Sequence, residues 1–346
     1  MRTTRPATRT LLRVVSPLAA IALALTACGG GSDDSDASSS SPQAVDSGAS
    51  LDSTWPLTGL AVSGDESAAQ SHPAYIVKVD NTEDSDPQIG LSQADMVTQE
   101  LVEGGITRLA VFYYTNLPSK VGPVRSMRAT DAGIAAPINA TIITSGAAGY
   151  TFKQLKKQHV RWIAMGNHNV TRILDGTHDT LHSVFANVKS IGKEAKTKTA
   201  RPEDYFTWGE ASDYTGKKKA SSIKAQFSGY RTDDFSYKGG KYVLANNYFA
   251  SGDAFTPDTV ITATVRTTIA PYTDPAGNPV PVSHFTGTGK AWIFHGGKAL
   301  KATWKKAGED ATVKFYVKGK QVKIPTGHTW LDLIPKSGGN VSFTAK

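Results

Sequence analysis

Residues 96–114 read MVTQELVEGGITRLAVFYY and predict a β-hairpin. The runs Met96 to Glu103 and Ile106 to Tyr114 are β-prone, and the Gly-Gly pair between them supplies the positive φ angles of a two-residue turn. With a loop of that length, Leu101 faces Arg108, and Glu103 lies diagonally from Arg108 on the same face. We therefore expect Glu103 to be within reach of the arginine side chain.

The sequence around this hairpin alternates between strand and helix patterns. The apolar run Ala74 to Val79 predicts a buried strand that ends in a turn at Asp80 and Asn81. A helix-like stretch begins near Ser126 and closes at Pro137, and Thr141 to Thr144 predict another strand. This alternation indicates a mixed α/β layer.

The length of 346 residues predicts about two domains. We expect an α/β N-terminal domain over residues 55–215 and a mostly β C-terminal domain over residues 216–346, an α+β chain overall, with the boundary in or just after the polar, lysine-rich stretch 195–219. Trp304 and Trp330 are expected in the core. The strands expected in the second domain are Tyr242 to Ala245, Val260 to Thr268, Ala291 to Phe294, Leu300 to Trp304, Val313 to Val317 and Val322 to Ile324.

Residues 1–27 have the regions of a bacterial signal peptide. Four arginines precede an apolar run, Val14 to Thr26, which is too short to span a membrane. Leu25-Thr26-Ala27-Cys28 resembles the lipobox of bacterial lipoproteins, in which the cysteine is diacylglycerylated and the peptide is cut before it. We expect Cys28, the chain's one cysteine, to anchor the protein in the cell membrane on the extracytoplasmic face. A plain secreted protein is the alternative.

Residues 28–54 combine the lipidated cysteine with a Gly/Ser/Asp/Ala tract that predicts a flexible stalk. The net charge of +8 falls to +4 without the four arginines of the signal peptide. Such mild basicity favours an anionic cell-wall polymer, lipid head groups or an envelope protein as partner, or serves solubility alone. Nucleic acid is not expected as a partner of an exported protein.

A cluster of charged residues in the first domain carries the main functional hypothesis. Gly122 to Arg128 predicts a turn into a helix N-terminus, where backbone N–H groups and the guanidinium groups of Arg125 and Arg128 bind phosphate or carboxylate. The candidate ligand-binding residues are Arg108, Arg125, Arg128, Asp80 and Asn81. The alternative is that these arginines pair with Glu100, Glu103 or Asp80 and tie the hairpin to the helix.

A cell-wall hydrolase or transferase is the competing hypothesis, with Glu103 as acid or base and His182 assisting. It requires both side chains in one cleft, because a base must come within hydrogen-bond reach of its target. Nucleophile, phosphate-loop, dinucleotide and zinc motifs are absent from the sequence, so we expect no cofactor.

A group of histidines and aspartates gives a weak metal signal. His178 and His182 would share one face of a helix, as metal-binding pairs do. Gly176 and Thr177 break that pattern, and we expect no metal site. The group comprises His168, Asp175, His178, Asp179 and His182.

A lysine-rich stretch marks the second domain. Residues 290–323 carry nine lysines against Glu309 and Asp310. They form either a binding face for an anionic polymer or charges that decorate strand edges and prevent sheet-to-sheet association, and the second reading is favoured.

Several short motifs resemble those of the YerB-like lipoprotein family, a two-part domain of unknown function of the DUF3048 type. The resemblance covers roughly Trp55 to Phe343 and implies an anchored extracytoplasmic protein with an α/β first part and a β-rich second part, without an assigned activity. The family's Pro-His-Asn step and following aromatic are matched only at His182 and loosely at Phe185. The motifs are Leu91 to Asp95, Leu101 to Arg108, Lys120 to Arg128, Gly287 to Gly289, Trp304-Lys305 and Gly327 to Trp330.

Overall fold

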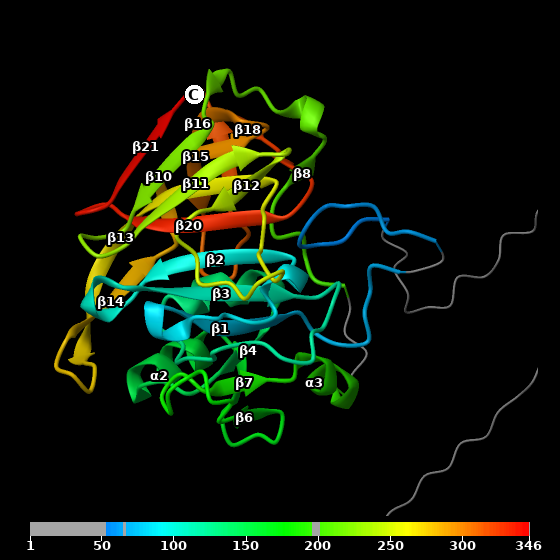
Figure 1. The fold of residues 1–346 in the computed structure, drawn as a ribbon. Helices are drawn as coiled ribbons and strands as arrows, with labels where there is room; N and C mark the ends of the chain where they lie inside the picture. Colours follow the sequence, from blue (N-terminus) through cyan, green and yellow to red (C-terminus); the bar gives the residue numbers. More distant parts are fainter. Residues whose placement is uncertain (1–52, 65–66, 196–200, 346) are drawn as a thin grey trace, which may run out of the picture. The chain divides into compact units, whose positions relative to one another are not determined.

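The structure is a computed structural model that describes residues 53–64, 67–195 and 201–345 (Figure 1). The predicted signal peptide, Cys28 and all of the predicted stalk except residues 53 and 54 lie outside the described residues. The described residues belong to one compact unit.

The N-terminal half builds five strands of a mixed sheet in the order β2-β3-β1-β4-β5. The antiparallel part is β2-β3-β1, and β1, β4 and β5 run parallel. The sequence alternation between strand and helix is therefore confirmed in this half. The strands are β1 (Tyr75–Asn81), β2 (Met96–Leu101), β3 (Thr107–Tyr113), β4 (Thr141–Thr144) and β5 (Arg161–Ala164).

The β2–β3 hairpin is confirmed, but its expected register is wrong. Glu100, rather than Leu101, faces Arg108, and Leu101 faces Thr107. The backbone of Val102 donates to the carbonyl of Ile106 at 2.9 Å, so three residues close the loop instead of two. Glu103 thus belongs to the turn and not to the strand, and the shift by one residue places Glu100 on the face that carries Arg108.

The helix expected from Ser126 is shorter than predicted. Residues 126–130 are not helical, because Val124 bridges Val79 of β1 and the Arg125 N–H donates to the carbonyl of Lys78 at 2.8 Å. The helix begins at Asp131, whose carboxylate accepts from the Arg128 N–H at 2.7 Å. Arg125 and Arg128 therefore do not share a helix face. The α-helices are α1 (Asp131–Ala135), α2 (Gly149–Lys157) and α3 (Val188–Glu194), and the 3-10 helices are η1 (Glu83–Ser85), η2 (Leu91–Gln93), η3 (Glu103–Gly105), η4 (Ala136–Ile138) and η5 (Ala211–Asp213).

The strands of the C-terminal half continue the same sheet. β20 (Thr329–Pro335) pairs parallel with β2 on one side and with β13 (Thr259–Thr273) on the other (Figure 1). Beyond β13 the order is β15 (Gly287–His295), β16 (Lys298–Lys306), β17 (Lys314–Val317) and β18 (Lys320–Val322), with β14 (Pro279–His284) paired to β13 and β9 (Lys218–Lys219) to β16. The predicted β-rich second half and the α+β class are confirmed.

A separate four-stranded sheet packs against the C-terminal part of the large sheet. Phe235 of β11 contacts Trp330 of β20 with ring centroids 5.7 Å apart. Trp330 and Trp304 are both buried, so the expectation that they belong to the core is confirmed. The four strands are β12 (Lys241–Leu244), β11 (Thr232–Lys238), β10 (Ser222–Gln226) and β21 (Asn340–Thr344). Two short pairs complete the fold, β6 (Val170–Arg172) with β7 (Val184–Ala186) and β8 (Trp208–Gly209) with β19 (Ile324–Pro325).

Two hydrophobic clusters cover the two faces of the N-terminal sheet. On one face, Ile76 and Phe112 pack with α1 and α2 residues such as Ile134 and Leu155. On the other, Val77 and Val111 belong to a cluster that includes Val188 and Ile191 of α3. Successive strand residues point to opposite faces, so the polar residues of β1 are divided between the two layers.

Candidate functional site

The candidate site lies at the carboxyl ends of β1 and β4, the edge at which open α/β sheets hold ligands. Asp80 is the penultimate residue of β1, and Ser145 directly follows β4. The segment around Arg125 runs between these strand ends, because the Ser145 N–H donates to the carbonyl of Arg125 at 3.1 Å. Backbone pairing to both strands therefore fixes Arg125 and Ser126 beside Asp80.

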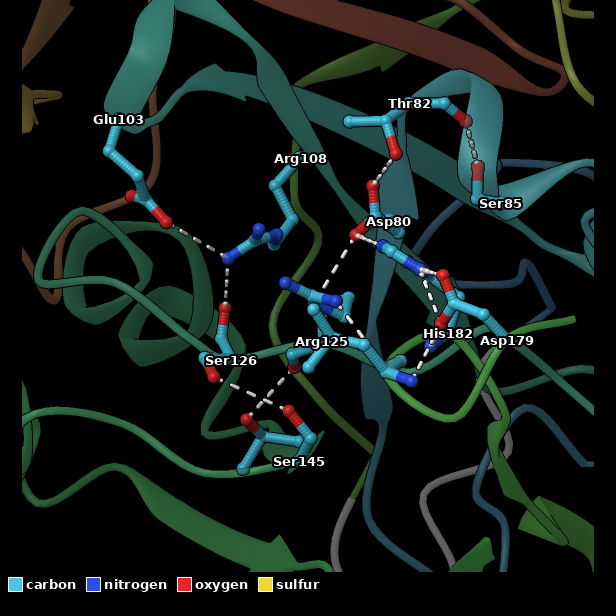
Figure 2. Close-up of polar contacts among 12 residues, drawn as sticks. Asp80, Thr82, Ser85, Glu103, Arg108, Arg125, Ser126, Ser145, Asp179 and His182 are labelled. Carbon is cyan, nitrogen blue, oxygen red and sulfur yellow. Dashed lines mark hydrogen bonds and ion pairs between the residues drawn. The ribbon is translucent and has the colours of Figure 1, made fainter. Parts of the chain in front are cut away.

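Arg125 is held by one carboxylate and one carbonyl. Its Nε lies 3.2 Å from Oδ2 of Asp80, and its Nη1 donates to the carbonyl of Leu181 at 3.3 Å (Figure 2). The Asp80 side chain is 1% exposed and also accepts from the Thr82 hydroxyl at 2.8 Å. The Arg125 side chain is 20% exposed, so it reaches from the buried Asp80 to the surface.

Arg128 and Arg108 surround Glu103. Arg128 donates to both carboxylate oxygens of Glu103, with 2.8 Å from its Nε to Oε2, and Arg108 Nη1 lies 4.0 Å from Oε1. The carbonyl of Ser126 accepts from both arginines, at 3.0 Å from Arg108 and 3.1 Å from Arg128. The side chains of Arg108 and Arg128 are 1% and 10% exposed, which makes them a buried brace rather than a surface patch.

His182 lies between two carboxylates. Its Nδ1 is 3.0 Å from both oxygens of Asp179, and its Nε2 is 3.7 Å from Oδ2 of Asp80 (Figure 2). The hydrogen bond from the His182 side chain, supported by backbone N–H groups of His182 and Leu181, lowers the pKa of Asp179 to about 2. The imidazole is therefore oriented by an ionised carboxylate, with its second nitrogen directed at Asp80.

Two serines add hydroxyl groups next to the arginines. The hydroxyl oxygens of Ser126 and Ser145 are 3.3 Å apart, and both residues are half-buried. Residues 126 and 145 come together through the pairing of the 122–128 segment with the end of β4.

A buried triad beneath this site was missed by the sequence reasoning. Lys78 Nζ lies 2.8 Å from Glu100 and 2.6 Å from Asp131, and all three side chains are fully or almost fully buried. Burial is the largest cause that raises the pKa of Glu100, to about 7, and the negative charge of Asp131 is the second. The signal for this triad was the lysine in the otherwise apolar run Ala74 to Val79.

The contacts keep the predicted catalytic pair apart and turn one candidate ligand-binding residue away from the arginines. Glu103 and His182 lie at opposite ends of the cluster, with Arg108 and Arg125 between them, and each carries its own partners (Figure 2). Asn81 donates to the Thr107 hydroxyl at 2.9 Å and accepts from Gln88, so its amide is used away from the arginines.

The histidine group does not converge on one point. His168 pairs with Glu194, His178 with Asp175, and His182 with Asp179. The helix that would have brought residues 178 and 182 together is not formed. Among the described residues, no group of three or more His, Cys, Asp or Glu side chains is arranged to hold a metal ion.

Within the part of the chain that the structure covers, no helix combines the length and the apolar character needed to cross a membrane.

The sequence and the fold of this chain were found to be similar to those of known proteins. The family described as "Protein of unknown function (DUF3048) N-terminal domain" matches residues 57–201, and its C-terminal domain matches residues 217–331. The protein named "Putative lipoprotein YerB" from Bacillus subtilis (strain 168) is 25% identical over 300 residues, which cover 81% of this chain and 86% of the relative. The crystal structure of the YerB protein from Bacillus subtilis superimposes with a TM-score of 0.68 at 20% identity, covering 84% of this chain and 99% of that one, so the fold is shared.

Proposed function

This chain belongs to the DUF3048 family of proteins of unknown function, and we propose from the geometry of its site that it binds an anionic group of a cell-envelope ligand through Arg125. The observation that carries this proposal is the exposure of Arg125, 20% against 1% for Arg108 and 10% for Arg128. An anion can reach the guanidinium of Arg125 without breaking the brace around Glu103.

The balance of charge supports an anionic ligand. Three guanidinium groups face two carboxylates, Asp80 and Glu103, while His182 is oriented by a carboxylate of its own. Arg108 and Arg128 share Glu103, and Arg125 pairs with Asp80. Burial lowers the local dielectric constant and strengthens the attraction of these guanidinium groups for an anion.

Neighbouring hydroxyl groups suit the oxygen atoms of such a ligand. Ser126 and Ser145 are half-buried next to Arg125 and hydrogen-bond each other at 3.3 Å, which leaves one of the two hydroxyl hydrogens to donate to a ligand. Guanidinium groups bind carboxylate and phosphate with short, charge-assisted hydrogen bonds. Carboxylate or phosphate is therefore the chemical class we assign to the bound group.

The hydrolase alternative receives no support from this arrangement. Arg128 and Arg108 lower the pKa of Glu103 despite its burial, which keeps this carboxylate ionised and unsuited to act as a general acid at neutral pH. Both of its oxygens are bonded to Arg128. Glu103 therefore acts in the brace.

The membrane tether is the second part of the proposal. The lipobox Leu25 to Cys28 and the name of the Bacillus subtilis relative both support a lipid anchor at Cys28. Two acyl chains hold a protein in a membrane stably. The ligand would then be an anionic cell-wall polymer or a protein of the extracytoplasmic face. Replacement of Cys28 by serine should move the chain out of the membrane fraction and abolish palmitate labelling; an unchanged membrane fraction would overturn the anchor.

Co-sedimentation of the purified full chain with isolated cell-wall fragments tests the ligand site. We expect Arg125→Ala to weaken binding about tenfold, the effect of losing about 1.4 kcal/mol. Arg161→Ala is the matched control, because Arg161 is an exposed arginine whose side chain, among the described residues, bonds only a backbone carbonyl at 3.5 Å. Inorganic phosphate should compete with the fragments for the unaltered chain. Equal binding by the two variants would sink the proposal.

A further inference from the structure

A cavity lies on the face of the large sheet, in the C-terminal half. It has a volume of about 720 Å³ and is lined by residues of β13, β14, β15, β16, β20 and β21 together with the loops next to them. None of its lining residues belongs to the Arg125 site. We refer to it as the basic groove, defined by Arg266, Lys290, Lys336, His284, Thr288 and Trp292.

The groove exists because β13 changes its partner. β13 pairs with β15 up to Ala263 and with β14 from Arg266 onward, so its middle residues lie at a fork between two neighbours. The four-stranded sheet covers the adjacent part of the face, where Phe343 of β21 packs against Trp292 with ring centroids 4.9 Å apart. The face beyond β21 is left uncovered, and β21 itself forms one margin of the groove.

Three cations gather around this cavity without a counter-charge. Arg266 and Lys336 are neighbours across β13 and the end of β20, because Val265 pairs with Pro335 and the Lys336 N–H donates to the carbonyl of Val265 at 2.8 Å. Lys290 comes from β15, and all three side chains are exposed. Among the described lining residues there is no aspartate or glutamate, and none of the three cations forms an ion pair within the described part of the chain.

The histidine of the groove does not add to this charge. His284 faces Arg266 directly across β13 and β14, and its Nε2 is 2.7 Å from the Thr268 hydroxyl. Burial is the largest cause that lowers the pKa of His284, and the positive charge of Arg266 is the second. The ring is therefore neutral at neutral pH. It supplies a hydrogen-bonding group instead, and the field of the groove comes from Arg266, Lys290 and Lys336.

The rest of the lining carries hydroxyl groups and an indole. Three threonines, including Thr288, and one asparagine line the cavity, and half-buried Trp292 forms part of its wall. Threonine hydroxyls both donate and accept, as the hydroxyls of a sugar do. A cavity of this size, with cations, hydroxyls and an indole converging on it, has the composition of a binding site for a polar ligand that carries negative charge.

We propose that the basic groove binds a segment of an anionic polysaccharide. Arg266, Lys290 and Lys336 contact its acidic groups, and the threonines and His284 contact its hydroxyl groups. A concave surface with one sign of charge concentrates such a polymer even from dilute solution. The proposal is independent of the Arg125 site, because the two sites share no residue and either can fail without the other.

Affinity measurements with dextran sulfate, and with neutral dextran of the same length, test the proposal on the purified full chain. We expect dextran sulfate to bind, neutral dextran to bind at least tenfold more weakly, and added salt to weaken the first complex. The double variant Arg266→Ser with Lys336→Ser should lose at least tenfold in affinity for dextran sulfate. The matched control, Lys314→Ser with Lys320→Ser, removes the same charge from exposed positions on β17 and β18.

The possible outcomes separate the proposal from general charge attraction. An equal loss in the two double variants would overturn it, as would polyglutamate binding as tightly as dextran sulfate. Arg161→Ala, which alters an exposed arginine outside the lining of the groove, should leave the affinity unchanged. As a second measurement on the unaltered chain, bound dextran sulfate should protect Lys290 and Lys336, but not Lys314, from reductive methylation. Absence of that protection would also overturn the proposal.

Discussion

Arg128 donates to both carboxylate oxygens of Glu103 and thereby ties the β2–β3 turn to the segment that enters α1. The two side chains are 10% and 11% exposed, so the pair is largely removed from water. All three arginines meet a carboxylate, Arg108 and Arg128 at Glu103 and Arg125 at Asp80, as the internal-brace alternative expected, and Arg125 is the most exposed of the three.

This brace predicts a stability effect that charge alone does not explain. Arg128→Met should lower the free energy of unfolding by about 3 kcal/mol, because it leaves the Glu103 carboxylate without its bidentate partner. Arg128→Lys should recover part of this loss, since it restores the charge but not the planar fork. Urea unfolding at neutral pH measures both, with Arg161→Met as a surface control. A loss below about 0.5 kcal/mol for Arg128→Met would contradict the assignment.

The Lys78 triad predicts a pH dependence of stability. Burial and Asp131 raise the pKa of Glu100 from 4.5 to about 7. Between these two values the folded chain holds a proton that the unfolded chain gives up, so this group's contribution to stability is full below pH 4.5 and is lost as the pH rises to about 7. Glu100→Gln should therefore flatten the change in unfolding free energy between pH 5 and 7.5.

The control for that experiment is Lys78→Met. It leaves Glu100 and Asp131 facing each other without a cation, and it should destabilise the chain by about 3–5 kcal/mol at neutral pH. If Glu100→Gln showed the same pH dependence as the unaltered chain, Glu100 would not be the titrating group.

The hydrogen bond between His182 and Asp179 predicts that removing the imidazole shifts the pKa of the Asp179 carboxylate measurably. His182→Ala should raise the pKa of Asp179 from about 2 toward its ordinary value of 3.8. The rise should be partial, because the backbone N–H groups of Leu181 and His182 still donate to this carboxylate. The stabilising effect of ionised Asp179 is present above pH 3.8 and is lost as the pH falls toward 2. Titration of the carboxyl carbon by NMR measures the shift. Asp175, whose pKa is lowered by His178 instead, should not change.

A glycine beside the basic groove predicts a local packing defect. A Cβ at position 289 would overlap the carbonyl of Thr264 and the Trp304 indole, which bond each other at 2.9 Å. Gly289→Ala should therefore destabilise the chain by about 2–3 kcal/mol and alter the fluorescence of Trp304. Gly149→Ala is the matched control, because nothing lies within 4 Å of its added Cβ at the start of α2. It should be neutral or stabilising by up to about 1 kcal/mol.

The sequence contained enough to predict the class of the fold and about half of the strands in the described residues, but not β20, which joins the two halves of the large sheet. Runs of apolar and β-prone residues predicted strands at the positions of β1, β2, β3 and β4. The strands predicted in the second half also lie near their observed positions. The register of the β2–β3 hairpin was wrong because the Gly-Gly pair also fits a three-residue loop, and a shift by one residue moved Glu100 opposite Arg108.

The sequence identified which residues form the candidate site, but not which carboxylate each arginine contacts. Arg108, Arg125 and Arg128 do gather, yet the carboxylate that each one meets depends on how the 122–128 segment pairs with β1. Arg266 and Lys336 are far apart in sequence and outside the lysine-rich stretch, and their proximity follows from the β13–β20 register alone. Pairings between distant strands cannot be read from local patterns.

The position of β20 has a consequence for the order in which the chain becomes stable. Met96 of β2 pairs with Thr329 of β20, so one edge of the N-terminal sheet stays open until nearly the whole chain is available. A chain that emerges through a membrane from its N-terminus would present this bare edge throughout its passage, and an open edge pairs readily with any other strand. Until β20 pairs with β2, this unpaired strand edge is therefore open to association with other chains.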